Sequence, residues 1–219
     1  MENNNVWEKS YQNTKRLWSS NPDSKLMQYF ELIKKGNMLD LGIGEGRNAI
    51  PFAFSGFNID GIDISETAIR RCKENLDDRD AVINLICSNL KEYEVKKDNY
   101  TAMIAANVLN FFRKSEIDEI IKRIKEGLKE DGIIYLSVFS TLEPQYNSIK
   151  ENKKQVEENT FYIDEKDSYA HFFTQEETKK YFEDFELICC CEGLEYDSGH
   201  GEPHYHGVIE FIARKKCSI

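Results

Sequence analysis

The chain is short of positive charge and lacks the segments that cross or reach a membrane. Its 219 residues carry 29 Lys and Arg against 39 Asp and Glu, a formal net charge of -10. Because binding to a phosphate backbone needs a basic footprint, this balance argues against nucleic acid or an anionic membrane surface as the main partner. No apolar run approaches the roughly 18 residues that span a bilayer, and the polar residues 1–5 lack the apolar core of a signal peptide. We therefore expect a cytoplasmic protein.

Paired cysteine motifs are also missing, and the totals set the size of the protein. The six cysteines do not recur as CxxC pairs, so the sequence indicates no zinc ribbon, and in the cytoplasm their thiols stay reduced. A chain of 219 residues with 40% hydrophobic and 31% charged residues is ordinary for a globular domain. We expect a single domain over residues 1–219, as a monomer or weak dimer.

Alternating strand-like and helix-like segments predict an α/β protein. The expected strands are 38–41, 58–62, 81–87, 100–105, 133–139, 185–192 and 208–214. The expected helices are 6–18, 24–35, 47–54, 65–76, 115–129 and 174–182, of which those at Ser115 and Thr174 begin like capping boxes. Alternation predicts a parallel sheet with helices on both faces, and the final hairpin adds one antiparallel strand. The fold class is therefore a doubly wound, seven-stranded, mostly parallel sheet in three layers.

The segment 140–170 differs from the rest of the chain. It is polar and charged, with scattered Tyr and Phe, and it contains Pro144. We interpret it as an insertion that covers the site. Its aromatic residues either line a substrate pocket or hold the segment to the surface.

A glycine-rich turn follows the first expected strand. Gly42, Gly44 and Gly46 alternate, and about twenty residues later the second strand ends at Asp63. Glycine lets the backbone come close to a ligand because no Cβ intrudes. A strand, such a turn and a helix place that ligand at the carboxyl edge of a parallel sheet, where Asp63 can accept hydrogen bonds from ribose hydroxyls.

The spacing and the flanking acids distinguish between cofactors. The dinucleotide fingerprint is G-x-G-x-x-G, whereas this loop reads G-x-G-x-G and has Arg47 at the position of the third fingerprint glycine. Asp40 and Glu45 flank the loop and would repel a pyrophosphate. The sulfonium and ammonium groups of S-adenosylmethionine would be attracted to them.

This stretch resembles the first motif of the class I S-adenosylmethionine-dependent methyltransferases, an acid followed by x-G-x-G-x-G. The resemblance implies the Rossmann-like fold of that family, with Asp40 organising the methionine end, the three glycines under the cofactor and Asp63 on the ribose. In the family an acid often stands at the position of Asn89, beside the adenine. Asn89 keeps a carbonyl acceptor there without the charge, or it is a turn or capping residue. Ile64 and Leu90 complete the cofactor-binding residues expected at this end.

Two further regions extend the expected cofactor site. Asn107 stands at the carboxyl edge of the fourth strand, where a polar residue would face the reacting methyl group. Trp7-Glu8, Tyr11, Trp18 and Pro22 resemble the amino-terminal pattern of small-molecule methyltransferases of the tellurite-resistance type and, more distantly, the thiopurine type. That resemblance implies a helical lid over residues 1–35, with Tyr11 and Trp18 beside the sulfonium as cation–π partners. The alternative is a hydrophobic staple that holds a terminal helix to the body.

Three of the four histidines, His200, His204 and His206, lie in the turn expected between the last two strands. The stretch around them resembles the ending of the tellurite-resistance type. His204 and His206 would share one face of a strand, where they act on the acceptor as a base or a binding group. Alternatively they bind a metal together with His200, or they are hydrogen-bonded turn residues. We predict no metal, and keep His204 and His206 as candidates for handling the acceptor.

Cys189, Cys190 and Cys191 are consecutive in an expected strand. Cys189 and Cys191 would share a face, and the pair is either a set of small hydrophobes or a capture site for a soft metalloid.

Together these features predict methyl transfer from S-adenosylmethionine to a small molecule or a metalloid oxyanion. The sequence names no dedicated catalytic residue, because an in-line displacement needs a base only if the acceptor must lose a proton. One alternative is a non-catalytic protein that senses S-adenosylmethionine or a metal. The other, a nicotinamide-dependent oxidoreductase, would need a third glycine at position 47 and a loop that favours phosphate.

Overall fold

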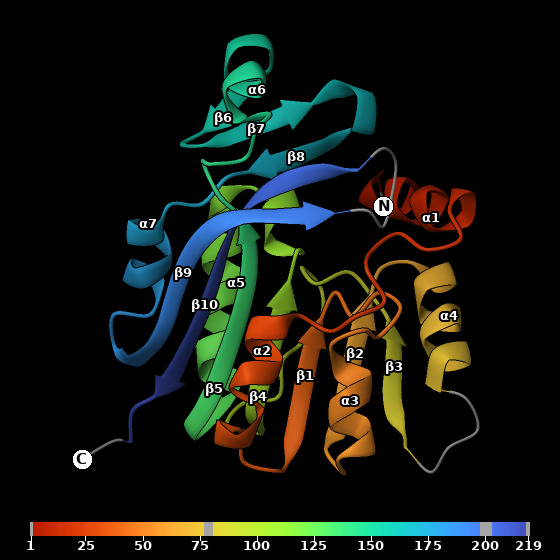
Figure 1. The fold of residues 1–219 in the computed structure, drawn as a ribbon, viewed down its shortest axis with the longest axis vertical. Helices are drawn as coiled ribbons and strands as arrows, with labels where there is room; N and C mark the ends of the chain where they lie inside the picture. Colours follow the sequence, from red (N-terminus) through yellow and green to blue (C-terminus); the bar gives the residue numbers. More distant parts are fainter. Residues whose placement is uncertain (1, 77–80, 198–202, 218–219) are drawn as a thin grey trace.

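A central sheet organises the computed structural model, which describes residues 2–76, 81–197 and 203–217 (Figure 1). Within these residues the sheet has seven strands in the order β3-β2-β1-β4-β5-β10-β9. Their bounds are β1 (Asn37–Leu41), β2 (Asn58–Asp63), β3 (Ile83–Cys87), β4 (Tyr100–Ala106), β5 (Leu128–Phe139), β9 (Phe185–Asp197) and β10 (His204–Lys215). The first five pair in parallel, and β10 runs antiparallel to both β5 and β9. The predicted mostly parallel sheet with a final antiparallel strand is confirmed.

Helices cover both faces of the sheet and give two cores (Figure 1). On one face α2 (Ser24–Gln28), α3 (Ala49–Phe54) and α4 (Glu66–Leu76) pack their apolar sides around Phe52. On the other face α5 (Lys114–Gly127) and α7 (Gln175–Tyr181) do the same, with four isoleucines of α5 buried in one stripe. That stripe follows the 3.6-residue period of a helix with one apolar side.

The segment after β5 forms a small layer of its own. It contains α6 (Tyr146–Asn152), β6 (Lys154–Glu157), β7 (Thr160–Ile163), the short helix η3 (Asp164–Lys166) and β8 (Ser168–His171), with β6, β7 and β8 paired in antiparallel order. At the top of Figure 1 it stands beyond the carboxyl ends of the parallel strands. Its aromatic residues Tyr146, Phe161 and Phe172 pack on one another.

Several predicted boundaries are wrong for local reasons. The helix expected over 24–35 ends at Gln28 and is followed by a tighter turn, η1 (Phe30–Leu32), which puts the ring of Phe30 4.6 Å from that of Phe52. The amino-terminal helix α1 (Glu2–Asn13) ends five residues early, and the chain then runs irregularly over the edge of the sheet.

The capping box expected at Ser115 is also wrong. The Glu116 carboxylate accepts a hydrogen bond from the Arg113 backbone N–H at 3.0 Å, while the Ser115 hydroxyl donates to Glu157 of β6 at 2.8 Å. The cap at Thr174 is confirmed, because its Oγ1 accepts from the Glu177 N–H at 3.1 Å.

The last two strands are longer than expected. Since β9 reaches Asp197 and β10 starts at His204, the two described histidines lie in a strand and not in the turn; His200 lies outside the described residues.

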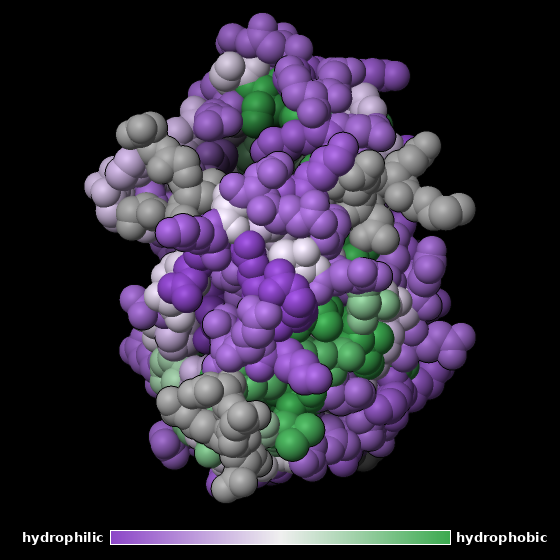
Figure 2. Space-filling model, turned by 90° about the vertical axis from the view of Figure 1, so that its right-hand side faces the viewer, coloured by the Kyte–Doolittle hydropathy of each residue, from purple (hydrophilic) through white to green (hydrophobic). Residues whose placement is uncertain are grey.

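Seen from the right-hand side of Figure 1, the surface is mostly hydrophilic (Figure 2). A hydrophobic area gathers low on this view, on the side of the edge strand β3. In the part of the chain that the structure describes, no helix combines the length and the apolar character that crossing a membrane requires.

Candidate functional site

A pocket of about 980 Å³, partly open to solvent, lies at the carboxyl ends of β1, β2 and β4. Most residues predicted to bind the cofactor line it: Tyr11, Trp18, Asp40, Gly42, Gly44, Asp63, Ile64, Asn89, Leu90 and Asn107. Gly46, His204 and His206 do not belong to the lining. The fold therefore gathers into one cavity residues that come from five separate segments of the sequence.

The glycine loop closes the floor of this pocket by two different contacts. Gly44 has a φ of +54°, and a Cβ placed on it would lie 2.7 Å from the Tyr11 hydroxyl oxygen. At Gly46, with φ +86°, a Cβ would lie 2.6 Å from the sulfur of Cys72 in α4. Gly44 thus lets the loop approach Tyr11 at the pocket, whereas Gly46 lets the loop pack against a helix.

Asp40, the last residue but one of β1, carries a buried carboxyl group. Within the described chain, no group hydrogen-bonds its Oδ2 atom. Burial raises the pKa of Asp40 to about 8, with Asp23 and Asp63 adding to the rise and Arg47 opposing it. A buried carboxylate oxygen without a partner costs free energy, and a cationic ligand in the pocket would remove that cost.

Asp63 is held more firmly. Its two carboxylate oxygens accept hydrogen bonds from the backbone N–H groups of Gly44 and Ser65, each at 2.9 Å. Burial raises the pKa of Asp63 to about 6 even though these bonds favour the charged form. The Gly44 bond ties the end of β2 to the glycine loop, so the two acids keep a fixed relation to each other.

Glu45, predicted to flank the loop as a charge near the ligand, and Arg47, at the position of the third fingerprint glycine, both have protein partners. Arg47 pairs with Asp23 at 2.6 Å, and Glu45 pairs with Arg71 at 2.9 Å and with Arg16 at 3.8 Å. The charge of Glu45 is therefore balanced. The acids left to meet a cationic ligand are Asp40 and Asp63, and such a ligand would favour their charged forms.

The two asparagines of the site have structural bonds as well. The Asn89 side-chain oxygen accepts from the Lys91 N–H at 3.0 Å, as a turn residue does. Asn107 has a φ of +54°, and its backbone N–H donates to the Ser137 carbonyl at 2.7 Å. This left-handed residue turns the chain at the end of β4, so the backbone itself shapes the pocket there.

An aromatic wall from the amino-terminal segment closes the pocket. The rings of Trp7 and Phe111 lie 4.3 Å apart, and both line the cavity together with Tyr11 and Trp18. Burial, with the nearby carboxylates of Asp63 and Glu45, raises the pKa of Tyr11 well above its usual value. The tyrosine is a neutral wall residue and not a base.

Sequence reasoning missed the residue that fixes α1. The Glu8 carboxylate accepts hydrogen bonds from the Ser65 hydroxyl at 2.7 Å and from the hydroxyl and N–H of Thr67 at 2.5 and 3.1 Å, at the start of α4. Partial burial opposes the charge, but these bonds prevail and lower the pKa of Glu8 to about 2. The sequence marked Glu8 only as the acid of the Trp7-Glu8-x-x-Tyr11 pattern. That pattern does not indicate that Ser65 and Thr67 are its partners.

The histidine pair lies behind the pocket wall. His206 stacks on Phe139 with ring centroids 4.9 Å apart, and Phe139 meets the lining residue Phe111 edge-on at 6.1 Å. One aromatic ring therefore separates His206 from the described lining. Farther along β9 the sulfur atoms of Cys189 and Cys191 lie 3.3 Å apart on a shared face, as the strand period predicts.

Comparisons with known proteins agree with this geometry. Residues 38–132 match the family model for a methyltransferase domain. A relative from Haemophilus influenzae, TehB, which is named as an S-adenosyl-L-methionine-dependent methyltransferase, is 26% identical over 180 residues, 80% of this chain and 52% of the relative. Over these residues the chain is similar to S-adenosylmethionine-dependent methyltransferases. A Geobacillus protein named as a methyltransferase is 32% identical over 125 residues, 57% of this chain and 50% of that protein.

Solved structures of methyltransferases show the same fold as this chain. The crystal structure of Haemophilus influenzae TehB matches with a TM-score of 0.71 and 19% identity, covering 98% of this chain and 67% of that one. A Burkholderia thailandensis 1,6-didemethyltoxoflavin-N1-methyltransferase was solved with 1,6-didemethyltoxoflavin and S-adenosylhomocysteine bound. It matches with a TM-score of 0.74 and 14% identity, covering 98% of this chain and 87% of that one. The chain spans about half the length of the curated relatives it matches.

The residues of the pocket fit S-adenosylmethionine, the cofactor named for the similar methyltransferases. The unpartnered oxygen of Asp40 suits the ammonium of S-adenosylmethionine, and the aromatic wall suits its sulfonium. Asp63, at the end of β2, suits the ribose hydroxyls.

Proposed function

We propose that this protein is a methyltransferase that transfers the methyl group of S-adenosylmethionine to an uncharged or cationic small molecule. The observation that carries the proposal is that one pocket with aromatic walls contains two buried acids, Asp40 and Asp63, whose pKa values are raised. One carboxylate oxygen of Asp40 has no hydrogen-bond partner among the described residues. A ligand with a permanent positive charge supplies the counter-charge that both acids lack.

The charge of the pocket supports this acceptor class over a metalloid oxyanion. Among the described residues that line the cavity, Arg47 is the one cation, and its guanidinium already pairs with Asp23. An anionic acceptor would enter without a counter-charge and close to Asp40 and Asp63. The named substrate of the Burkholderia relative is likewise a small molecule.

Bound S-adenosylmethionine supplies an electrophilic methyl group on sulfur. The chain's own residues bind and orient: Asp40 takes the ammonium and Asp63 the ribose. Trp7, Tyr11 and Phe111 exclude water from the space beside Asn107, where the acceptor would lie. Holding two reactants in line is worth about 7–11 kcal/mol of barrier, so positioning suffices for this reaction without a dedicated base.

The test is formation of S-adenosylhomocysteine by the purified chain with a panel of small amines, thiols and phenols, and with tellurite and selenite. We expect product with members of the first group only. Asp63→Asn should lose most of the activity through weaker cofactor binding. Asp60→Asn, on the same strand outside the pocket, is the matched control and should retain it.

Turnover of an oxyanion alone would contradict the acceptor class. Tight cofactor binding without product from any acceptor would favour a sensor over an enzyme.

A further inference from the structure

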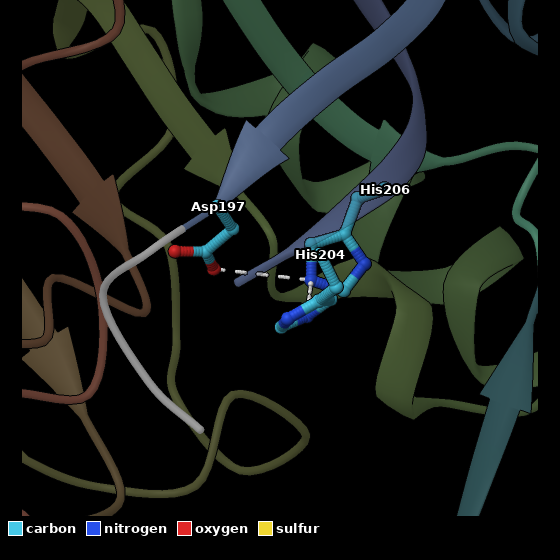
Figure 3. A group of neighbouring side chains, drawn as sticks. All are labelled: Asp197, His204 and His206. Atoms are coloured by element: carbon cyan, nitrogen blue, oxygen red, sulfur yellow. Dashed lines mark hydrogen bonds and ion pairs between the residues drawn. The ribbon is translucent and has the colours of Figure 1, made fainter. Parts of the chain in front are cut away.

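The ends of β9 and β10 bring three metal-binding side chains together beside the pocket. Asp197 pairs with His204 across the two strands, and His206 follows two residues later on the same face. Figure 3 shows the Asp197 carboxylate and the two imidazole rings pointing toward one another from adjacent strand ends. These three side chains form a compact group although they come from two strands.

The distances within this group are those of ligands to one ion. The Nε2 atoms of His204 and His206 are 2.9 Å apart, and His206 Nε2 lies 3.8 Å from Asp197 Oδ2. One donor atom from each residue lies within 4.8 Å of the others. Zinc binds nitrogen at about 2.0–2.1 Å and carboxylate oxygen at about 2.0–2.2 Å, which sets its tetrahedral ligands about 3–4 Å from one another.

A buried carboxylate behind His206 orients its ring for this role. Glu143 is 7% exposed, and its Oε2 lies 3.1 Å from His206 Nδ1 and accepts the backbone N–H of Gly207 at 3.0 Å. With Nδ1 of His206 donating to this carboxylate, its Nε2 would present a lone pair toward His204 and Asp197. This carboxylate–histidine arrangement is the usual second shell of a metal-bound imidazole.

The ring of His206 is fixed on its other side as well. It stacks on Phe139 with an angle of 18° between the planes. A ligand held by a carboxylate and an aromatic face loses little freedom when it binds an ion, which favours affinity.

We propose that Asp197, His204 and His206 form a binding site for a divalent transition-metal ion, with Glu143 as the group that orients His206. Two imidazoles and one carboxylate suit Zn²⁺ and its first-row neighbours better than Mg²⁺ or Ca²⁺, which take oxygen ligands. The proposal goes beyond methyl transfer and does not depend on it, because the ligands lie outside the described cofactor lining.

The chain contains a competing thiol pair, which the experiment must separate. Cys189 and Cys191 lie farther along the same face of β9, and their sulfur atoms would also bind Zn²⁺. All measurements are therefore made in a Cys189→Ser/Cys191→Ser background as well as in the native chain, both without a polyhistidine tag. S-Adenosylmethionine is left out, so that failure of the cofactor site does not affect the result.

The test is calorimetric titration with Zn²⁺, together with the visible absorption of bound Co²⁺. We expect one site that survives removal of the two cysteines, and visible Co²⁺ bands without thiolate charge transfer. His204→Ala and Asp197→Asn should each weaken Zn²⁺ binding at least tenfold, and Glu143→Gln about ten- to hundredfold. Tyr205→Ala changes an exposed residue between the two histidines and should have no effect.

Two results would overturn the proposal. One is Zn²⁺ affinity that is unchanged in the His204→Ala and Asp197→Asn variants while circular dichroism shows them folded. The other is metal binding that disappears when the two cysteines are replaced.

Discussion

At the residue scale, the site is defined by two acids whose burial opposes their charge. The pKa values of Asp40, about 8, and Asp63, about 6, both exceed the ordinary 3.8. The folded chain therefore holds protons that the unfolded chain has released once the pH exceeds about 4. These two acids make the free energy of unfolding fall as the pH rises from about 4 to 8. This loss of stability is the cost of a site made for a cation.

Asp40→Asn tests that account directly. Without the charge, the variant should bind S-adenosylmethionine about ten- to a hundredfold more weakly, since hydrogen bonds to charged groups contribute about 1.5–3 kcal/mol. The free energy of unfolding of this variant should also fall less than that of the native chain between pH 5 and pH 8. Urea unfolding at both pH values and calorimetric titration measure the two effects.

Asp60→Asn is a control in which the pKa shift of the replaced acid has the opposite sign. Partial burial opposes the charge of Asp60, but bonds from Asn84, Lys96 and Tyr100 outweigh it and lower its pKa. Loss of the Asp60 carboxylate should reduce the free energy of unfolding at neutral pH and spare cofactor binding.

One outcome would contradict the prediction for Asp40→Asn. If the free energy of unfolding changes with pH equally in the native chain and in Asp40→Asn, Asp40 is already ionised in the free protein.

At the scale of elements, α1 closes the pocket because one carboxylate docks it on the start of α4. The pKa of Glu8 is lowered from 4.5 to about 2, so its bonds to Ser65 and Thr67 favour folding above about pH 4.5. That contribution is lost as the pH falls from 4.5 toward 2. An acid at a helix amino terminus also interacts favourably with the helix dipole.

Glu8→Gln should release α1 while leaving the sheet intact. We expect faster protease cleavage before Trp18 and weaker cofactor binding, with little change in the midpoint of global unfolding. Glu31→Gln, an exposed acid on η1, is the control and should behave like the native chain. If α1 stays protected in Glu8→Gln, the aromatic contacts alone hold the lid.

A second prediction at this scale concerns the approach of β10 to the turn after β5. A Cβ at Gly207 would lie 2.2 Å from the backbone nitrogen of Glu143, whereas one at Gly193, opposite Val208 in the hairpin, meets nothing within 4 Å. Gly207→Ala should therefore destabilise the fold by about 1–3 kcal/mol. Gly193→Ala should be neutral or stabilising by up to about 1 kcal/mol. Chemical unfolding compares them, and equal effects would show that the turn relaxes without cost.

These elements also show what the sequence was able to predict. Strands β1 and β2, the glycine loop and Asp63 carry strong local signals, because apolar runs and turn residues act over a few neighbours. The docking of Glu8 on Ser65 and the pairing of Arg47 with Asp23 join residues far apart in the chain, and no local pattern encodes them. The small sheet β6-β7-β8 was missed because its strands have four residues each, and β6 and β8 carry polar residues on both faces.

The histidine pair shows a related limit. The alternation of His204 and His206 correctly placed them on one face of a strand. The turn assigned to them was wrong, because β9 and β10 continue past the apolar run from which the strand lengths were estimated. The role of Glu143, 63 residues away from His206 in sequence, could be found only from the fold.

At the scale of the whole molecule, the sheet brings acids from β1 and β2 and aromatic residues from α1 and the loop after β4 to one edge. A net charge of -10 on the chain suits a cationic cofactor and a small acceptor. The match of residues 38–132 to a methyltransferase domain covers the strands that carry the two acids, while α1 and the histidine pair lie outside that range.

The measurement that tests the central claim most directly is parallel calorimetric titration of the purified chain with S-adenosylmethionine, S-adenosylhomocysteine and NAD. The pocket predicts micromolar binding of the first two, none of NAD, and loss of binding in Asp63→Asn. Binding of NAD alone, or native affinity in Asp63→Asn, would contradict the site described for this chain.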